Sequence, residues 1–368
     1  MATSGRSFLA ARFLCGFAEG GVPTTSYGWA GEFLLPAHKP RAGIALQIGF
    51  VVGTLLVTLG SYSSGEHQWR ALSAVVSFCS LPIALLCLFA PESPRWLHRA
   101  GLPARASAVL HRIAHLNGRG NASPASIELT VGSGAEEKAT MLPPLPRDEP
   151  LPNPLSPRTR QQPSLFRLLV VDATFRRVLL LLCLHWCVYS ALFFGLSLHE
   201  AHDVHAALLA SSCQIPTVFC TALSFDRFGR RSTMLVLLCA ASFACAAMAT
   251  LAAGLPAPEG THALLSTIGV ATMSGSFAGG YIFSSELLPT DVRAVGLALC
   301  SQSSRVGGFF SPFALLIKNP AVPYTLWSAA ALIAGFSSLW LPETLGEPSL
   351  ESLDDLRALV SRRAGRHR

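Results

Sequence analysis

The chain has 368 residues, of which 51% are hydrophobic and 13% are charged, and its mean hydropathy is +0.44. Soluble domains carry about 25% charged residues, so the composition excludes a soluble protein and indicates a polytopic membrane protein. The net charge of +7 could suggest nucleic-acid binding, but the positions of the basic residues argue against it, as shown below.

Nine stretches are long enough, at roughly 20 residues, to span a bilayer as helices. The first contains Arg12 and Glu19 but is rich in glycine, which transmembrane helices tolerate. The expected helices cover residues 7–33, 42–62, 69–90, 178–198, 206–225, 232–254, 263–285, 294–317 and 322–341. The sequence therefore predicts an all-α integral membrane protein.

Short loops that contain basic residues, such as those with Arg41, Arg230 and Arg293, alternate with short loops that contain none. The short loops without Lys or Arg are 63–68, 199–205 and 255–261. The positive-inside rule places the basic loops, and with them the C-terminus, in the cytoplasm. The positive charge thus reflects topology, and no nucleic-acid partner is expected.

Two pairs of motifs repeat along the chain. Glu32-Phe-Leu-Leu-Pro36, followed by Arg41, matches Glu286-Leu-Leu-Pro289, followed by Arg293. Pro-Glu likewise follows both the third and the ninth expected helix. The repeat unit is therefore six helices, and two units would make twelve. We expect about three helices of the complete fold to be absent from the chain.

The repeat and the composition predict four segments. They are a partial N-terminal half with three transmembrane helices at 1–97, a Pro-rich linker at 98–177, a complete six-helix half at 178–344, and a basic tail at 345–368. Linker and tail fall on the cytoplasmic side. Within the linker, residues 99–116 have helix-like spacing and are expected to form a surface helix.

Five motifs are similar to the signature loops of the organic cation, anion and zwitterion transporters, which are solute carrier family 22 of the major facilitator superfamily. They are RFLCGFAEGG at 12–21, PESPRWL at 91–97, DRFGRR at 226–231, ELLPTDVR with a following RVGG within 286–308, and LPET at 341–344. The resemblance implies the fold of that superfamily with nine of its usual twelve helices. It also implies a secondary-active carrier of small organic ions in the plasma membrane.

Arg305 lies about eleven residues into an otherwise apolar run that begins at Ala294. A guanidinium at this depth costs a few kcal/mol or more unless it faces a cavity or a partner, so it is a candidate substrate anchor. The resemblance implies an anionic substrate, because the family's cation carriers tend to have Asp here and its anion carriers Arg. The alternatives are a structural pair with an acidic residue such as Glu19, or snorkelling.

Three further residues are candidates for substrate binding. Gln214 stands at a position where the resemblance implies Glu in the family's cation carriers. The acidic partner of a cation is therefore absent here. Gln214 can hydrogen-bond a substrate, but a neutral contact between helices is an equal alternative. Trp186 and Tyr189 belong to an aromatic stripe similar to the family's cavity wall, with packing as the alternative.

Charged residues near the expected cytoplasmic helix ends are candidates for an inner gate, whose ion pairs would break in each transport cycle. The alternative for the arginines is simple topological anchoring. The candidates are Asp226, Arg227, Arg230, Arg231, Glu286 and Arg293, with Glu32 and Arg41 in the first copy of the repeat.

No cofactor, metal site or catalytic residue is predicted. The outer loop from His199 to His205 contains three histidines, but its HEAHDVH spacing does not match the HExxH pattern of catalytic zinc sites. An enzyme is therefore not expected. Two functions remain, a carrier of organic anions that works by alternating access, and a non-transporting receptor, scaffold or truncated modulatory form of the same fold. Neither the substrate nor the oligomeric state follows from the sequence.

Overall fold

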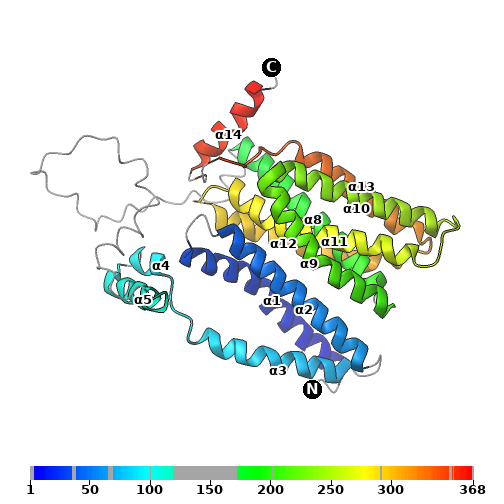
Figure 1. Cartoon of the computed structure of the whole chain (residues 1–368), viewed down its shortest axis with the longest axis horizontal. Coiled ribbons are helices and arrows are strands. Elements are labelled where there is room, and N and C mark those ends of the chain that lie inside the picture. The colour runs from blue at the N-terminus through cyan, green and yellow to red at the C-terminus, as the bar shows by residue number, and fades with distance from the viewer. Residues whose placement is uncertain are drawn as a thin grey trace, which may run out of the picture. The chain divides into compact units, whose positions relative to one another are not determined.

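The computed structural model describes residues 4–34, 39–64, 69–99, 101–118, 172–200, 203–290, 292–347, 350 and 352–366. The regular structure of these residues is helical (Figure 1). The helices are α1 (Gly5–Phe33), α2 (Lys39–Ser64), α3 (Trp69–Cys87), α4 (Pro94–Arg99), α5 (Pro103–Leu116), α8 (Ala173–Glu200), α9 (Val204–Phe228), α10 (Arg230–Ala252), α11 (Thr261–Leu287), α12 (Arg293–Ala314), α13 (Ala321–Ser338) and α14 (Leu353–Arg366).

Each of the nine expected spans coincides with a long helix, but the count of nine is not exact. In the described residues, five helices are long and apolar enough to cross a membrane: Ala42–Ser63, Arg70–Cys87, Ala173–Leu198, Val204–Phe228 and Arg230–Ala252. The glycine residues of α11 allow neighbouring helices to approach closely. The short helices α4, α5 and α14 add to the total, and α5 falls within the surface helix expected at 99–116.

The described chain divides into two compact units. The larger unit comprises Met1–Tyr27, Ala37–Val76 and Pro163–Arg368, and the smaller comprises Gly28–Pro36 and Ser77–Gln162. In the smaller unit, the Ser93 hydroxyl accepts a hydrogen bond from the Trp96 N–H at 3.2 Å and so caps α4. The indole N–H of Trp29 donates to the Pro91 carbonyl at 3.2 Å. The motif at 91–97 is thus a helix stop followed by a capped helix start.

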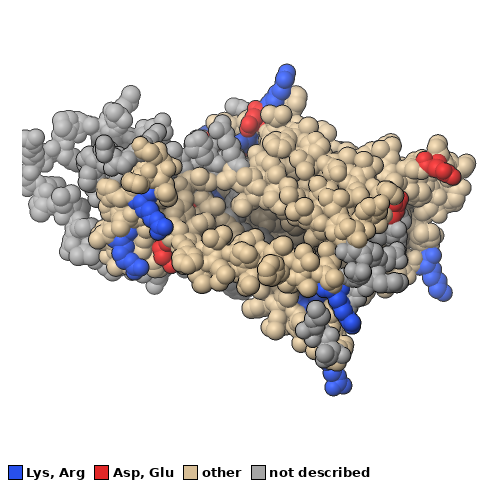
Figure 2. Space-filling view, turned by 60° about the horizontal axis from the view of Figure 1, so that its bottom comes forward, with Lys and Arg blue, Asp and Glu red and all other residues tan. Residues whose placement is uncertain are grey.

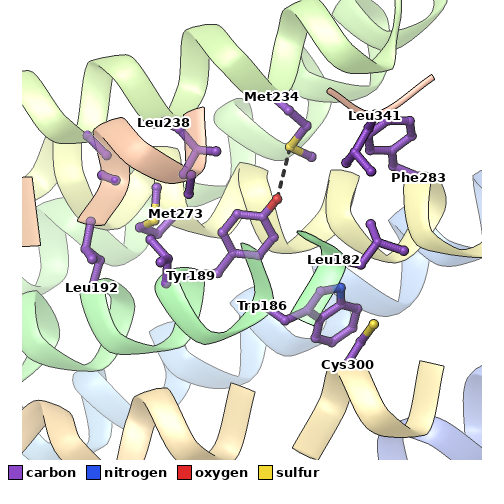
Figure 3. Packing of buried hydrophobic residues seen from close by; sticks show 14 of the residues in the cluster. Leu182, Trp186, Tyr189, Leu192, Met234, Leu238, Met273, Phe283, Cys300 and Leu341 are labelled. Atoms are coloured by element: carbon purple, nitrogen blue, oxygen red, sulfur yellow. Dashed lines mark hydrogen bonds between the residues drawn. The ribbon is translucent and has the colours of Figure 1, made fainter. Parts of the chain in front are cut away.

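In the larger unit, α8 to α13 lie side by side as a bundle (Figure 1). Its apolar core contains the buried side chains of Trp186, Tyr189, Leu192 and Met273 (Figure 3). Glycine makes the closest approaches possible. A Cβ atom on Gly280 would lie 2.8 Å from Cε2 of Tyr189, so a larger residue there would displace the ring.

The second helix packs against this bundle. Val51 of α2 is buried with Val218 of α9, and the hydroxyls of Thr58 and Ser211 lie 3.5 Å apart across the same two helices. In Figure 2, most of the visible surface is uncharged, with Lys, Arg, Asp and Glu scattered singly over it. This pattern suits a surface in contact with lipid.

The basic tail contains an ordered helix, which sequence reasoning did not predict. Leu356 and Leu359 of α14 are buried in the core of the larger unit. The Arg357 guanidinium donates to the Asp172 carboxylate at 3.0–3.1 Å, and the same carboxylate accepts hydrogen bonds from the N–H groups of Thr174 and Phe175 at the start of α8. Asp172 therefore caps α8 and holds the tail helix at once.

Candidate functional site

Five aromatic rings form a connected cluster between α8 and α11. We call Trp186, Tyr189, Phe193, Phe277 and Tyr281 the aromatic cluster. The ring centroids of Trp186 and Tyr281 lie 4.5 Å apart at 76°. Phe277 contacts Trp186, Tyr189 and Phe193 edge-on, with centroids 5.7–6.3 Å apart. These edge-to-face geometries are favourable and hold the rings in fixed orientations.

The polar tips of the two predicted residues are both occupied by protein groups. The Trp186 indole N–H donates to the Ser284 hydroxyl at 3.0 Å, and the Tyr189 hydroxyl donates to the Met234 sulfur at 3.6 Å (Figure 3). Both side chains are 2% exposed. Trp186 and Tyr189 are thus brought together, but in the packed interior rather than at an open surface.

The cluster reaches more exposed rings at its Phe193 end. Phe193 lies 5.5 Å from Phe194 on its own helix and 6.3 Å from Phe50 on α2, between ring centroids. Phe194 and Phe50 are both exposed. Phe277, Tyr281 and Phe50 were missed by sequence reasoning, although Phe277 and Tyr281 stand four residues apart on one face of α11 and so gave a signal.

Arg305 on α12 pairs with Glu19 on α1, 286 residues away in the sequence. One guanidinium nitrogen, Nη1, lies 3.3 Å from Oε1 of Glu19. The Arg305 side chain is 40% exposed and that of Glu19 is 68% exposed. The contact is single and at the long end of the hydrogen-bond range, so it is a weaker bond than the bidentate pairing that a guanidinium can make.

Gln214 lies inside α9 and is buried. Its amide oxygen, Oε1, has no hydrogen-bond partner among the described residues. A buried acceptor without a partner costs about 1–3 kcal/mol, so such a group calls for an explanation. The side chain can accept a hydrogen bond from a molecule that enters the bundle.

Among the gate candidates, Arg230 and Glu286 form an ion pair. The Nε and Nη2 atoms of Arg230 each donate to one carboxylate oxygen of Glu286, both at 3.0 Å, and the Thr344 hydroxyl donates to the same carboxylate at 2.5 Å. A third guanidinium nitrogen donates to the Phe225 carbonyl at 3.1 Å. This fork joins the start of α10 to the end of α11 within the six-helix half.

Glu343 completes this arrangement and was missed as a functional residue. Its carboxylate accepts hydrogen bonds from the backbone N–H groups of Arg230 at 2.9 Å and Arg231 at 3.1 Å, which lie in the first turn of α10. Gly229 precedes them with φ of +90°, and a Cβ there would lie 2.7 Å from the carboxylate. The repeated Pro-Glu motif was the available signal, since it placed a carboxylate after the last helix of each half.

Two other gate candidates contact backbone carbonyls or an aromatic ring. Arg293 donates to the backbone carbonyls of Leu288 at 3.0 Å and Leu350 at 3.3 Å. The Arg227 guanidinium lies 5.7 Å from the Phe228 ring centroid.

The remaining predicted charges have fewer contacts. Arg231 contributes its backbone N–H to Glu343. The Asp226 side chain is exposed and has no ion pair with a described residue, and that of Glu32 is also exposed. The side chain of Arg41 lies outside the described residues.

In the loop with three histidines, Asp203 caps α9 by accepting hydrogen bonds from the N–H groups of His205 at 2.9 Å and Ala206 at 3.3 Å. The side chains of His199, Glu200 and His202 lie outside the described residues.

Comparisons with known proteins agree with this helical architecture. A family model described as Major Facilitator Superfamily matches residues 1–312. Over 93% of the chain, the fold is similar to the partially occluded inward-open xylose transporter XylE from E. coli, with a TM-score of 0.68, 16% identity and 72% of that chain covered. At this identity the likeness concerns the fold alone.

Relatives at higher identity come from one group of transporters. The chain is 31% identical to solute carrier family 22 member 15 of Xenopus tropicalis over 97% of its own length. It is 31% identical to an organic cation transporter-like protein of Drosophila melanogaster over 94%, and 27% identical to organic anion transporter 3 of Oryctolagus cuniculus over 95%. It spans 63%, 59% and 61% of the lengths of these three relatives.

Proposed function

Because the chain belongs to the Major Facilitator Superfamily and, within it, to solute carrier family 22, we propose that it is a secondary-active carrier of small organic anions that works by alternating access. The relatives' names include both a cation and an anion transporter, so the substrate charge has to be argued from the residues of this chain. The observation that carries the anionic substrate is the exposed, singly paired guanidinium of Arg305 in α12.

The pairing of Arg305 leaves room for a substrate. Within the described residues its guanidinium makes one side-chain hydrogen bond, to Glu19, so most of its N–H donors are available. A carboxylate or sulfonate on a substrate can bind two of these donors in parallel, which is stronger than the single 3.3 Å contact. In this proposal, the substrate anion replaces Glu19 on Arg305, and Glu19 keeps the charge neutralised when the site is empty.

The other candidates have secondary roles in this scheme. Gln214 would accept a hydrogen bond from a substrate N–H or O–H, which gives its buried amide oxygen a partner. Trp186 and Tyr189 would form a rigid wall, since their polar tips are already engaged. A neutral Gln at this position also removes the carboxylate that would attract a cation.

The Arg230–Glu286 fork would support the inner gate without being one of the pairs that break. Since the fork joins α10 and α11 of one half, its role would be to keep those helix ends together as one body while the halves rock. The other charged residues at the expected cytoplasmic ends would supply the pairs that form and break across the halves: Asp226, Arg227, Arg231, Arg293, Glu32 and Arg41.

Uptake by cells that express the chain tests the proposal. The probes are labelled aromatic carboxylates and sulfonates, with tetraalkylammonium cations as the opposite charge class, and surface abundance is measured by biotinylation. We expect Arg305→Gln to reduce anion uptake at least tenfold, Arg305→Lys to reduce it less, and Glu19→Gln to keep it. Arg362→Gln, a substitution of an exposed arginine in α14, is the matched control.

Unchanged anion uptake by Arg305→Gln at equal surface abundance would refute the role of Arg305. Concentrative uptake of the cations, abolished by the same substitution, would refute the anionic assignment. Saturable anion binding at the cell surface without any uptake would instead indicate the non-transporting receptor.

A further inference from the structure

A groove lies on the outer side of the bundle where α8 begins and the chain leaves α13. Its volume is about 550 Å³, and its lining includes Arg176, Arg177, Leu180, Leu184 and Trp340. The α8 residues follow one another at intervals of three and four, so they form a single stripe along the helix. At a rise of about 1.5 Å per residue, the stripe places its leucines roughly 5–12 Å deeper along α8 than its arginines.

The groove is positively charged at one end and apolar at the other. The side chains of Arg176 and Arg177 are exposed, and so are those of Leu180 and Leu184. Trp340 is 61% exposed, in the manner of the tryptophans that mark the boundary between headgroups and hydrocarbon.

From this arrangement we propose that the groove binds one anionic phospholipid of the cytoplasmic leaflet. The phosphate and the anionic headgroup contact Arg176 and Arg177, the indole of Trp340 lies at the glycerol level, and an acyl chain covers Leu180 and Leu184. The positive-inside pattern places the start of α8 at the cytoplasmic surface, where anionic lipids are concentrated. Arg305 is not among the residues that line the groove, and the proposal does not depend on what the protein transports.

Native mass spectrometry of the purified full chain tests the site, with the protein released from nanodiscs of phosphatidylcholine or of phosphatidylserine mixed with phosphatidylcholine. We expect one tightly bound phosphatidylserine. Each arginine near an anionic surface contributes enough for about a fivefold change in affinity, so Arg177→Gln should weaken binding about fivefold and the double variant with Arg176→Gln roughly 25-fold. Arg177→Lys should retain most of the affinity.

Arg227→Gln is the matched control, because Arg227 is another exposed arginine beside an exposed aromatic ring, Phe228, but lines no part of the groove. An equal loss in this variant would overturn the proposal by showing general attraction to the positive surface. Full competition by soluble glycerophosphoserine would overturn it in favour of a free-phosphate site. A changed oligomeric mass with unchanged lipid binding would assign the groove to another copy of the chain.

A second measurement needs no arginine variant. The emission of Trp340 is the difference between the fluorescence of the unchanged chain and that of Trp340→Phe. Brominated phosphatidylserine should quench this emission more strongly than brominated phosphatidylcholine does. Equal quenching by the two lipids would also overturn the proposal.

Discussion

Replacement of Glu343 by Ala should destabilise the C-terminal half, because this carboxylate is the cap of α10. It accepts charge-assisted hydrogen bonds from two backbone N–H groups, at 2.9 and 3.1 Å, at the positive end of the helix dipole. Loss of a cap costs about 1 kcal/mol, and loss of the charge at the dipole adds about 0.3–1 kcal/mol. We therefore expect Glu343→Ala to cost about 1–2 kcal/mol, and Glu343→Gln less than half of that.

The assay is thermal unfolding of the purified protein in detergent, followed by the loss of monodisperse material. A loss of about 1–2 kcal/mol corresponds to a midpoint lower by several degrees. Glu92→Ala is the matched control, since Glu92 occupies the same place in the first Pro-Glu motif, is exposed and has no hydrogen bond to a described residue. A midpoint unchanged in Glu343→Ala, or lowered equally in Glu92→Ala, would refute the capping role.

Two further predictions concern packing and charge in the same half. A double-mutant cycle of Arg230→Gln and Glu286→Gln, measured by the same thermal assay, should give a coupling free energy of about 1–3 kcal/mol for the fork. Additive effects would show that the two side chains act independently. Gly307→Ala should lower the unfolding midpoint, since its Cβ would overlap the backbone carbonyl of Cys187. Gly53→Ala, with open space around the new Cβ, should leave the midpoint unchanged or raise it slightly. Equal effects of the two would contradict the close approach of α8 and α12.

The positions of the long helices follow from the sequence alone. Whether a segment enters a bilayer depends on its own length and apolar content, and both are local properties. The motifs at the helix ends identified the family, and the lone charge of Arg305 stood out against an apolar run without any knowledge of its neighbours. Small-residue helices such as α11 are less clear, because glycine and serine serve packing rather than hydropathy.

The partners of these residues were decided by the tertiary structure. Glu19 meets Arg305 only because α1 lies near α12, and Glu343 caps α10 only because the chain after α13 returns to the start of that helix. Phe277 and Tyr281 join Trp186 for the same reason. Hydropathy determines that a helix is buried in lipid or protein, but not its rotation or its neighbours. Those depend on side-chain shape, on close approach at glycines and on polar pairing between segments that are distant in the sequence.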